Sequence, residues 1–409
     1  MAELPSMLSR GERARLFPVL ADTSREGRTL SIFLSCFETV DEFGRSLLTS
    51  IDAPIRARTK IETFTEVVLK KNENGSSARP DGLILLNNGS KQWTALVEAK
   101  VGNSDLTIEQ IEAYLNLAKA NSIDALITLS NQFTPLPTHH PLNVPPNRRK
   151  VELYHWSWMY VVTQSTLHLS DDEVSDREQR VILREMNRFL LHPSSGVKGF
   201  DQMPAAWTEV VSKVIAGAPV AVNATETQEV VGAWHQEIGD LCLVLSRQLE
   251  TSVKVKMSRS HAANPVERQR DAQRTLAEQA QLTAILEVPD CAAPIHICAD
   301  FKARALTLSI KLKAPEDLKS AKARLNWLLR QLQKSEPSGL HIRCYWPGRA
   351  ASTQHPLAAL RENPDLLSIE RPGLVLLSFD IVMTKDLGPR FGQRKNFISE
   401  LETIVPDFY

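Results

Sequence analysis

The chain has 409 residues, of which 43% are hydrophobic, and its 48 lysines and arginines balance its 48 aspartates and glutamates. This length exceeds the roughly 250 to 300 residues at which a single hydrophobic core stops growing, so we expect two domains. The zero net charge excludes a general electrostatic attraction to nucleic acid or to anionic membranes, and any basic surface must be local.

The cysteines and the apolar segments narrow the class of protein further. Five scattered cysteines without a C-x-x-C pair support neither a disulfide framework nor a zinc site. The N-terminus lacks the pattern of a signal peptide, and no stretch reaches the ~18 apolar residues that a membrane span needs. We therefore expect a cytoplasmic protein without a membrane partner.

The first predicted element is an amphipathic helix over residues 29–50, where Phe33, Phe37 and Leu47 recur at helical spacing. Alternating and β-branched residues then predict three successive strands, separated by turn-forming segments. A helical period begins at Thr107 and is followed by another buried strand. After the first helix, the order is thus strands at 63–70, 78–86 and 93–100, a helix from 107, and a strand at 125–129.

A proline-rich connection over residues 134–150 interrupts this pattern. Each proline removes a backbone donor and biases its predecessor toward extended geometry, so we expect a long surface excursion. A strand at 151–158 and a helix at 177–193 follow. We expect these elements to complete an α/β domain over residues 1–215.

The C-terminal part of the chain has a different organisation. Small and polar residues without a strong period at 215–227 mark the domain boundary. Beyond it, residues 228–409 contain helices and strands in an order typical of an α+β domain. Its role is left open between recognition, partner binding and oligomerisation.

Three charged residues point to chemistry in the first domain. Asp81 follows Pro80 at a strand, and Glu98 and Lys100 end the next strand after a hairpin. Because strand side chains alternate, Glu98 and Lys100 project from the same face, and the neighbouring strand can bring Asp81 beside them. The alternative is a simple ion pair between Glu98 and Lys100 at a strand end.

Two carboxylates with a few water ligands suit Mg²⁺ or Mn²⁺, and the carbonyl of Ala99 is a further oxygen donor. Such a site can bind a phosphodiester and lower the pKa of an attacking water. Lys100 could orient that water, help to deprotonate it, or contact a phosphate oxygen.

Pro80-Asp81 with Glu98-Ala99-Lys100, in this order of elements, resembles the PD-(D/E)XK nuclease superfamily, which includes many restriction and repair endonucleases. The resemblance covers roughly residues 30 to 135. It implies a restriction-endonuclease-like mixed sheet flanked by helices, with Asp81, Glu98 and Lys100 as catalytic residues. It also implies that Asp81, Glu98 and Ala99 bind the metal cofactor.

Gln110 and Tyr114 fit the Q-x-x-x-Y motif that a subset of this superfamily carries on the following helix. Their spacing puts both on one helix face. By the resemblance they support the active site or contact the nucleic-acid backbone, and the alternative is an ordinary helix face.

The superfamily often has one more acidic residue upstream, and several residues compete for this place. Glu66 is favoured because it lies in an apolar strand, where a carboxylate is energetically unfavourable unless it has a specific role. Glu42 on the first helix is the alternative, and Glu62 is a weaker one.

The resemblance implies a metal-dependent endonuclease that acts on DNA, in restriction, phage defence or repair. A rival interpretation is a non-catalytic adaptor or regulatory protein with the same fold, which binds nucleic acid or a protein partner. A third is a structural oligomerisation protein. DNA versus RNA, cleavage specificity and a homodimer are left open.

Overall fold

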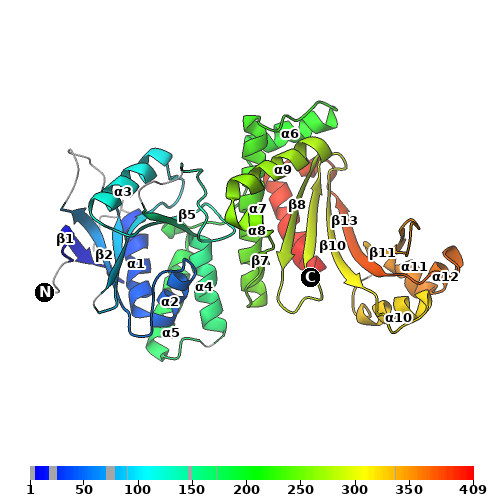
Figure 1. Ribbon diagram of the computed structural model, residues 1–409, viewed down its shortest axis with the longest axis horizontal. Coiled ribbons are helices and arrows are strands. Elements are labelled where there is room, and N and C mark those ends of the chain that lie inside the picture. Colours follow the sequence, from blue (N-terminus) through cyan, green and yellow to red (C-terminus); the bar gives the residue numbers. More distant parts are fainter. Residues whose placement is uncertain are drawn as a thin grey trace. The chain divides into compact units, whose positions relative to one another are not determined.

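A computed structural model gives the arrangement of the chain (Figure 1). It describes residues 5–17, 25–70, 79–89, 91–145, 150–171, 173–336 and 338–409. The chain forms two compact units, unit 1 from Met1–Asp201 with His235–Ser252 and unit 2 from Gln202–Trp234 with Val253–Tyr409. The long helix α7 (Thr225–Leu249) therefore contributes to both units.

Unit 1 contains a mixed six-stranded sheet with strands in chain order. The first four strands pair antiparallel, and the last three pair parallel. With helices on the sheet, this is a mixed α/β arrangement. The strands are β1 (Leu8–Arg13), β2 (Lys60–Leu69), β3 (Gly82–Asn87), β4 (Gln92–Ala99), β5 (Ala125–Ser130) and β6 (Glu152–Ser157).

Helices cover both faces of this sheet because its strands are apolar on both sides. Ile84 and Leu86 of β3 lie in one core cluster, whereas Leu83 and Leu85 lie in the other. The first cluster is closed by α1 (Arg25–Thr39), α2 (Asp41–Thr49), α4 (Trp158–Ser170) and α5 (Arg177–Leu190), and the second by α3 (Ile108–Ala120). Burial on both faces is what makes these strands near-continuous apolar runs.

The single helix expected over residues 29–50 is wrong in two respects. It begins earlier, at Arg25, and it breaks at Val40, whose φ of −95° and ψ of 93° are extended. The second helix turns back against the first, and a Cβ atom at Gly44 would collide with the carbonyl oxygen of Phe37. The hydrophobic period alone could not reveal this break, because both helices bury apolar residues in the same core.

The proline-rich connection contains no helix or strand in its described residues, 134–145 and 150. Strand β6 then leads directly into α4, whose first turn is capped by Ser157. Within the described ranges, no helix is long and apolar enough to span a bilayer.

Unit 2 contains a seven-stranded sheet in which every described pairing is antiparallel. The strand order is β12-β11-β13-β10-β9-β8-β7. The strands are β7 (Lys254–Val255), β8 (Gln281–Glu287), β9 (Ile295–Asp300), β10 (Ala305–Lys313), β11 (Leu340–Tyr345), β12 (Thr353–Pro356) and β13 (Ser378–Asp386). The helices besides α7 are α6 (Ala205–Ile215), α8 (Arg259–Ala263), α9 (Pro265–Gln279), α10 (Ala321–Gln331), α11 (Leu357–Glu362), α12 (Leu366–Glu370) and α13 (Arg394–Phe408).

Helix α6 belongs to unit 2, although the expected boundary at 215–227 placed it in the first domain. Its Trp207 packs against Phe301, Phe391 and Phe397, with ring centroids 4.8, 5.5 and 4.3 Å away. The indole Nε1 also donates to the carbonyl of Phe391 at 2.7 Å. These partners lie far along the chain, so the local pattern near 215 could not show where α6 packs.

Candidate active site

Asp81 directly precedes β3. It therefore lies at the open end of the β3-β4 hairpin, opposite the turn. The register pairs Gly82 with Val97, so Asp81 reaches the last residues of β4. Its Oδ2 accepts a hydrogen bond from the backbone N–H of Ala99 at 2.9 Å. A Cβ atom at Gly82 would lie 2.9 Å from Leu34 Cδ1, and glycine therefore lets the strand carry Asp81 into this position.

Glu98 is almost completely buried, with 1% of its surface exposed. Its Oε1 accepts hydrogen bonds from Lys100 Nζ at 2.7 Å and from Gln110 Nε2 at 2.7 Å. Its Oε2 is buried and has no hydrogen-bond partner among the described residues. A buried carboxylate is costly unless its oxygens are satisfied, and half of this one is available to a further ligand.

Glu98 is close enough to influence the protonation of Asp81. Burial, together with the negative charge of Glu98, raises the pKa of Asp81 to about 8, against the lowering effect of the Ala99 hydrogen bond and of Lys100. A nearby negative charge disfavours the ionised form of a carboxyl group, and an additional positive charge favours it. The site thus favours binding of additional positive charge.

Lys100 is fixed by its backbone as well as by its ammonium group. Its N–H donates to the carbonyl of Leu129 at 2.8 Å, and its carbonyl accepts from Trp158 Nε1 at 2.8 Å. Burial tends to lower the pKa of Lys100, but the hydrogen bond and charge of Glu98, with smaller effects from Glu26 and Asp81, raise it overall. Lys100 therefore stays a cation at neutral pH and is a donor, not a base.

The following helix α3 positions Gln110 against Glu98. Thr107 caps the helix by accepting from the backbone N–H of Gln110 at 3.2 Å. Gln110 Nε2 also lies 3.4 Å from Tyr114 Oη, which donates to the carbonyl of Arg79 at 3.1 Å. Burial, and then the charge of Glu98, raises the pKa of Tyr114, so its hydroxyl remains a donor. Both motif residues thus contact the site, Gln110 directly and Tyr114 through Gln110 and the loop before Asp81.

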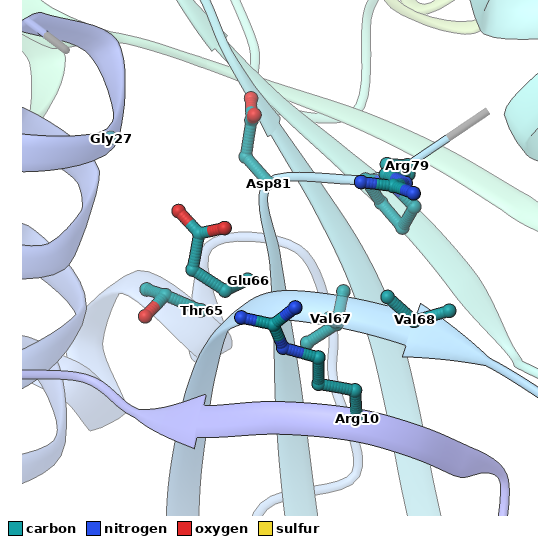
Figure 2. A pocket seen from close by; sticks show the side chains of 9 residues that line it. Arg10, Gly27, Thr65, Glu66, Val67, Val68, Arg79 and Asp81 are labelled. Atoms are coloured by element: carbon teal, nitrogen blue, oxygen red, sulfur yellow. The ribbon is translucent and has the colours of Figure 1, made fainter. Parts of the chain in front are cut away.

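Glu66 lies beside the site. It is exposed and has a φ of 53°, at a point where the pairing of β1 with β2 is irregular. Such β-bulges redirect side chains at sheet edges. Glu66 lines a small pocket together with Asp81 (Figure 2), but within the described residues it has no hydrogen bond or ion pair with Glu98 or Lys100.

The two other candidates for the upstream acid have different surroundings. Glu42 lies in the first turn of α2 and lines neither described pocket. Glu62 is bound by Arg13 and Lys60, each at about 3 Å.

Glu26 is an acidic neighbour of the site that the sequence analysis missed. It lies in the first turn of α1, and its Oε2 is 3.7 Å from Lys100 Nζ. The expected helix began at residue 29, which left Glu26 outside it. An acidic residue in a helix's first turn is a common N-terminal signal and could have prompted an earlier start.

The donor set suits a hard divalent cation. In the parts of the chain that the structure describes, no group of three or more His, Cys, Asp or Glu side chains forms a complete metal cage. Magnesium does not need one, because it is usually bound by one or two carboxylates and keeps several waters. The buried, unpartnered Oε2 of Glu98 beside Asp81 fits this mode of binding.

Comparisons of the chain with protein-family models, with curated proteins and with solved structures found no match.

Proposed function

We propose that unit 1 is a divalent-metal-dependent nuclease with a restriction-endonuclease-like fold, which hydrolyses phosphodiester bonds in DNA. The main observation in support of this proposal is the environment of the Glu98 carboxylate. One of its oxygens is held by Lys100 and Gln110, and the other is buried without a partner next to Asp81. A purely structural ion pair would not require the second carboxylate or the glutamine.

Each residue has a distinct role in this proposal. Asp81 and Glu98 would hold Mg²⁺ or Mn²⁺, with the carbonyl of Ala99 as a further donor. When bound, such an ion polarises a phosphodiester oxygen and lowers the pKa of an attacking water. Lys100, a permanent cation at neutral pH, orients that water or binds a phosphate oxygen.

Gln110 and Tyr114 are positioning residues. Gln110 fixes the rotamer of Glu98 through Oε1, which turns Oε2 toward the cation site. Tyr114 holds the segment before Asp81 through the carbonyl of Arg79. Partners of metal ligands commonly tune affinity or activity by about 10- to 100-fold.

The test is a cleavage assay on the full chain with supercoiled plasmid, linear duplex, single-stranded DNA and RNA, each with Mg²⁺, Mn²⁺ or EDTA. Asp81→Ala and Glu98→Ala should abolish cleavage and weaken metal binding in a calorimetric titration. Lys100→Ala should abolish cleavage but leave metal affinity unchanged or higher, because a neighbouring positive charge is lost.

Glu109→Ala is the matched control, since Glu109 is an exposed glutamate in the first turn of the same helix α3. It should behave like the unchanged chain. Full cleavage by a folded Glu98→Ala variant would exclude the mechanism. A parent chain that cleaves none of the substrates with either metal would favour the non-catalytic adaptor.

A further inference from the structure

A small pocket adjoins the candidate active site on the side of the edge strand β1. It has a volume of about 110 Å³ and shares Asp81 with the site. Figure 2 shows Arg10, Arg79, Glu66 and Asp81 around the same space, with α1 beyond it. Gly27 of α1 also lines the pocket and has no side chain that could fill it.

The two arginines of this pocket are not engaged elsewhere in the described structure. Neither the Arg10 nor the Arg79 guanidinium forms an ion pair or a hydrogen bond with another described residue. Arg13, on the same strand as Arg10, is by contrast bound by Glu38 and Glu62. Both arginines are exposed and line the pocket, and guanidinium groups match the oxygens of a phosphate.

The size of the pocket limits what it can hold. Pockets for drug-sized ligands enclose roughly 300 to 1,000 Å³, and about 110 Å³ leaves room for a phosphate group but not for a nucleoside. Glu98 and Lys100 are not among the lining residues, so the pocket lies next to the proposed cleavage centre and not within it.

We propose that Arg10 and Arg79 bind one phosphate of the substrate other than the phosphate that is cleaved. This inference rests on the proposed nuclease function and names two residues that would position its substrate. The pocket also contains the carboxyl groups of Glu66 and Asp81, and a carboxylate opposes the binding of an anion. A divalent cation at Asp81 adds positive charge, and phosphate binding should therefore be stronger when that cation is bound.

Inorganic phosphate is the probe for a first experiment, which needs no turnover. In a thermal melt of the full chain, phosphate should raise Tm more in the presence of Mg²⁺ than in EDTA. Arg10→Gln and Arg79→Gln should each weaken the apparent phosphate affinity at least about tenfold, as expected for a lost charge-assisted hydrogen bond. Arg58→Gln, at an exposed arginine of unit 1 outside this pocket, should leave the affinity unchanged. The proposal is overturned if phosphate has no effect on the Tm of the parent chain, or if both pocket variants bind phosphate as tightly as the parent does.

A second experiment uses cleavage and identifies the source of the phosphate. Arg10→Gln and Arg79→Gln should raise KM at least about tenfold and change kcat less than about twofold, because the contact is equal in the ground and transition states. A KM effect confined to linear DNA with a 5′-phosphate, and lost with a 5′-hydroxyl end, assigns a terminal phosphate. An equal effect on closed circular DNA assigns an internal phosphodiester.

The two proposals fail in different ways. Metal-dependent cleavage with an unchanged KM in both arginine variants refutes the phosphate pocket and leaves the nuclease function intact. A chain that cleaves nothing refutes the nuclease function, and the melting experiment with inorganic phosphate still decides whether the pocket binds this anion.

Discussion

Asp81→Asn should stabilise the metal-free protein at neutral pH. Burial and the charge of Glu98 raise the pKa of Asp81 to about 8, whereas an aspartate in an unfolded chain titrates near ~3.9. Between these two values the folded chain holds a proton that the unfolded chain has released. The contribution of Asp81 to the free energy of unfolding is therefore fully present at acidic pH. It is lost as the pH rises from the unfolded pKa of ~3.9 to the folded pKa of about 8.

The size of the effect follows from one proton. A difference of one bound proton changes the free energy of unfolding by about 1.4 kcal/mol per pH unit, so the loss from about pH 4 to about pH 7 is at most ~4 kcal/mol. Relaxation of the neighbouring groups reduces it, and we expect about 1 to 4 kcal/mol. Asparagine at position 81 keeps an oxygen for the N–H of Ala99 but never ionises, so the variant avoids this loss.

The assay is thermal melting of the full chain in EDTA between about pH 5 and about pH 9. Each kcal/mol should shift the Tm of the unit 1 transition by about 2 to 4 °C. The Tm of Asp81→Asn minus that of the parent should grow with pH and level off above the pKa of about 8. Asp105→Asn, at an exposed aspartate of the same unit, should show no such trend. With Mg²⁺ added, only the parent and this control should gain stability. A Tm difference between Asp81→Asn and the parent that is constant across the pH range would refute the reasoning.

Three further substitutions test the supports of the site. Gln110→Leu removes the hydrogen bond that orients Glu98 and should lower kcat about 10- to 100-fold with little change in fold, which steady-state kinetics and circular dichroism can measure together. Gly82→Ala places a Cβ atom 3.0 Å from a backbone oxygen of β2; it should cost about 1 to 3 kcal/mol by overpacking, and a melt with an unchanged Tm would contradict the close approach. Glu26→Gln removes one of the negative charges near Lys100; it should lower the pKa of that ammonium group, seen as a downward shift of the alkaline limb of the cleavage pH profile, and an unshifted limb would argue against electrostatic coupling.

Local sequence pattern was sufficient to predict the centre of the candidate site. Glu98 and Lys100 are two residues apart at the end of β4, and a short hairpin joins that strand to the one that follows Asp81. The alternation of strand side chains and the antiparallel register of a hairpin act over fewer than about 20 residues, so they can be read without tertiary information. The same holds for Gln110, because helical spacing and the cap at Thr107 are local.

The surroundings of that centre depended on contacts between distant segments. Strand β1 is mostly polar and pairs along one edge of the sheet, so its sequence has no apolar alternation that predicts a strand. Arg10 lines the pocket because β1 pairs with β2. Glu26 reaches Lys100 from a helix more than 70 residues earlier in the chain. Side-chain periodicity reports which face of an element is buried, but it does not report against which other element that face packs. Which elements pack against each other is decided by shape complementarity and burial across the whole unit, and these are defined only in the folded chain.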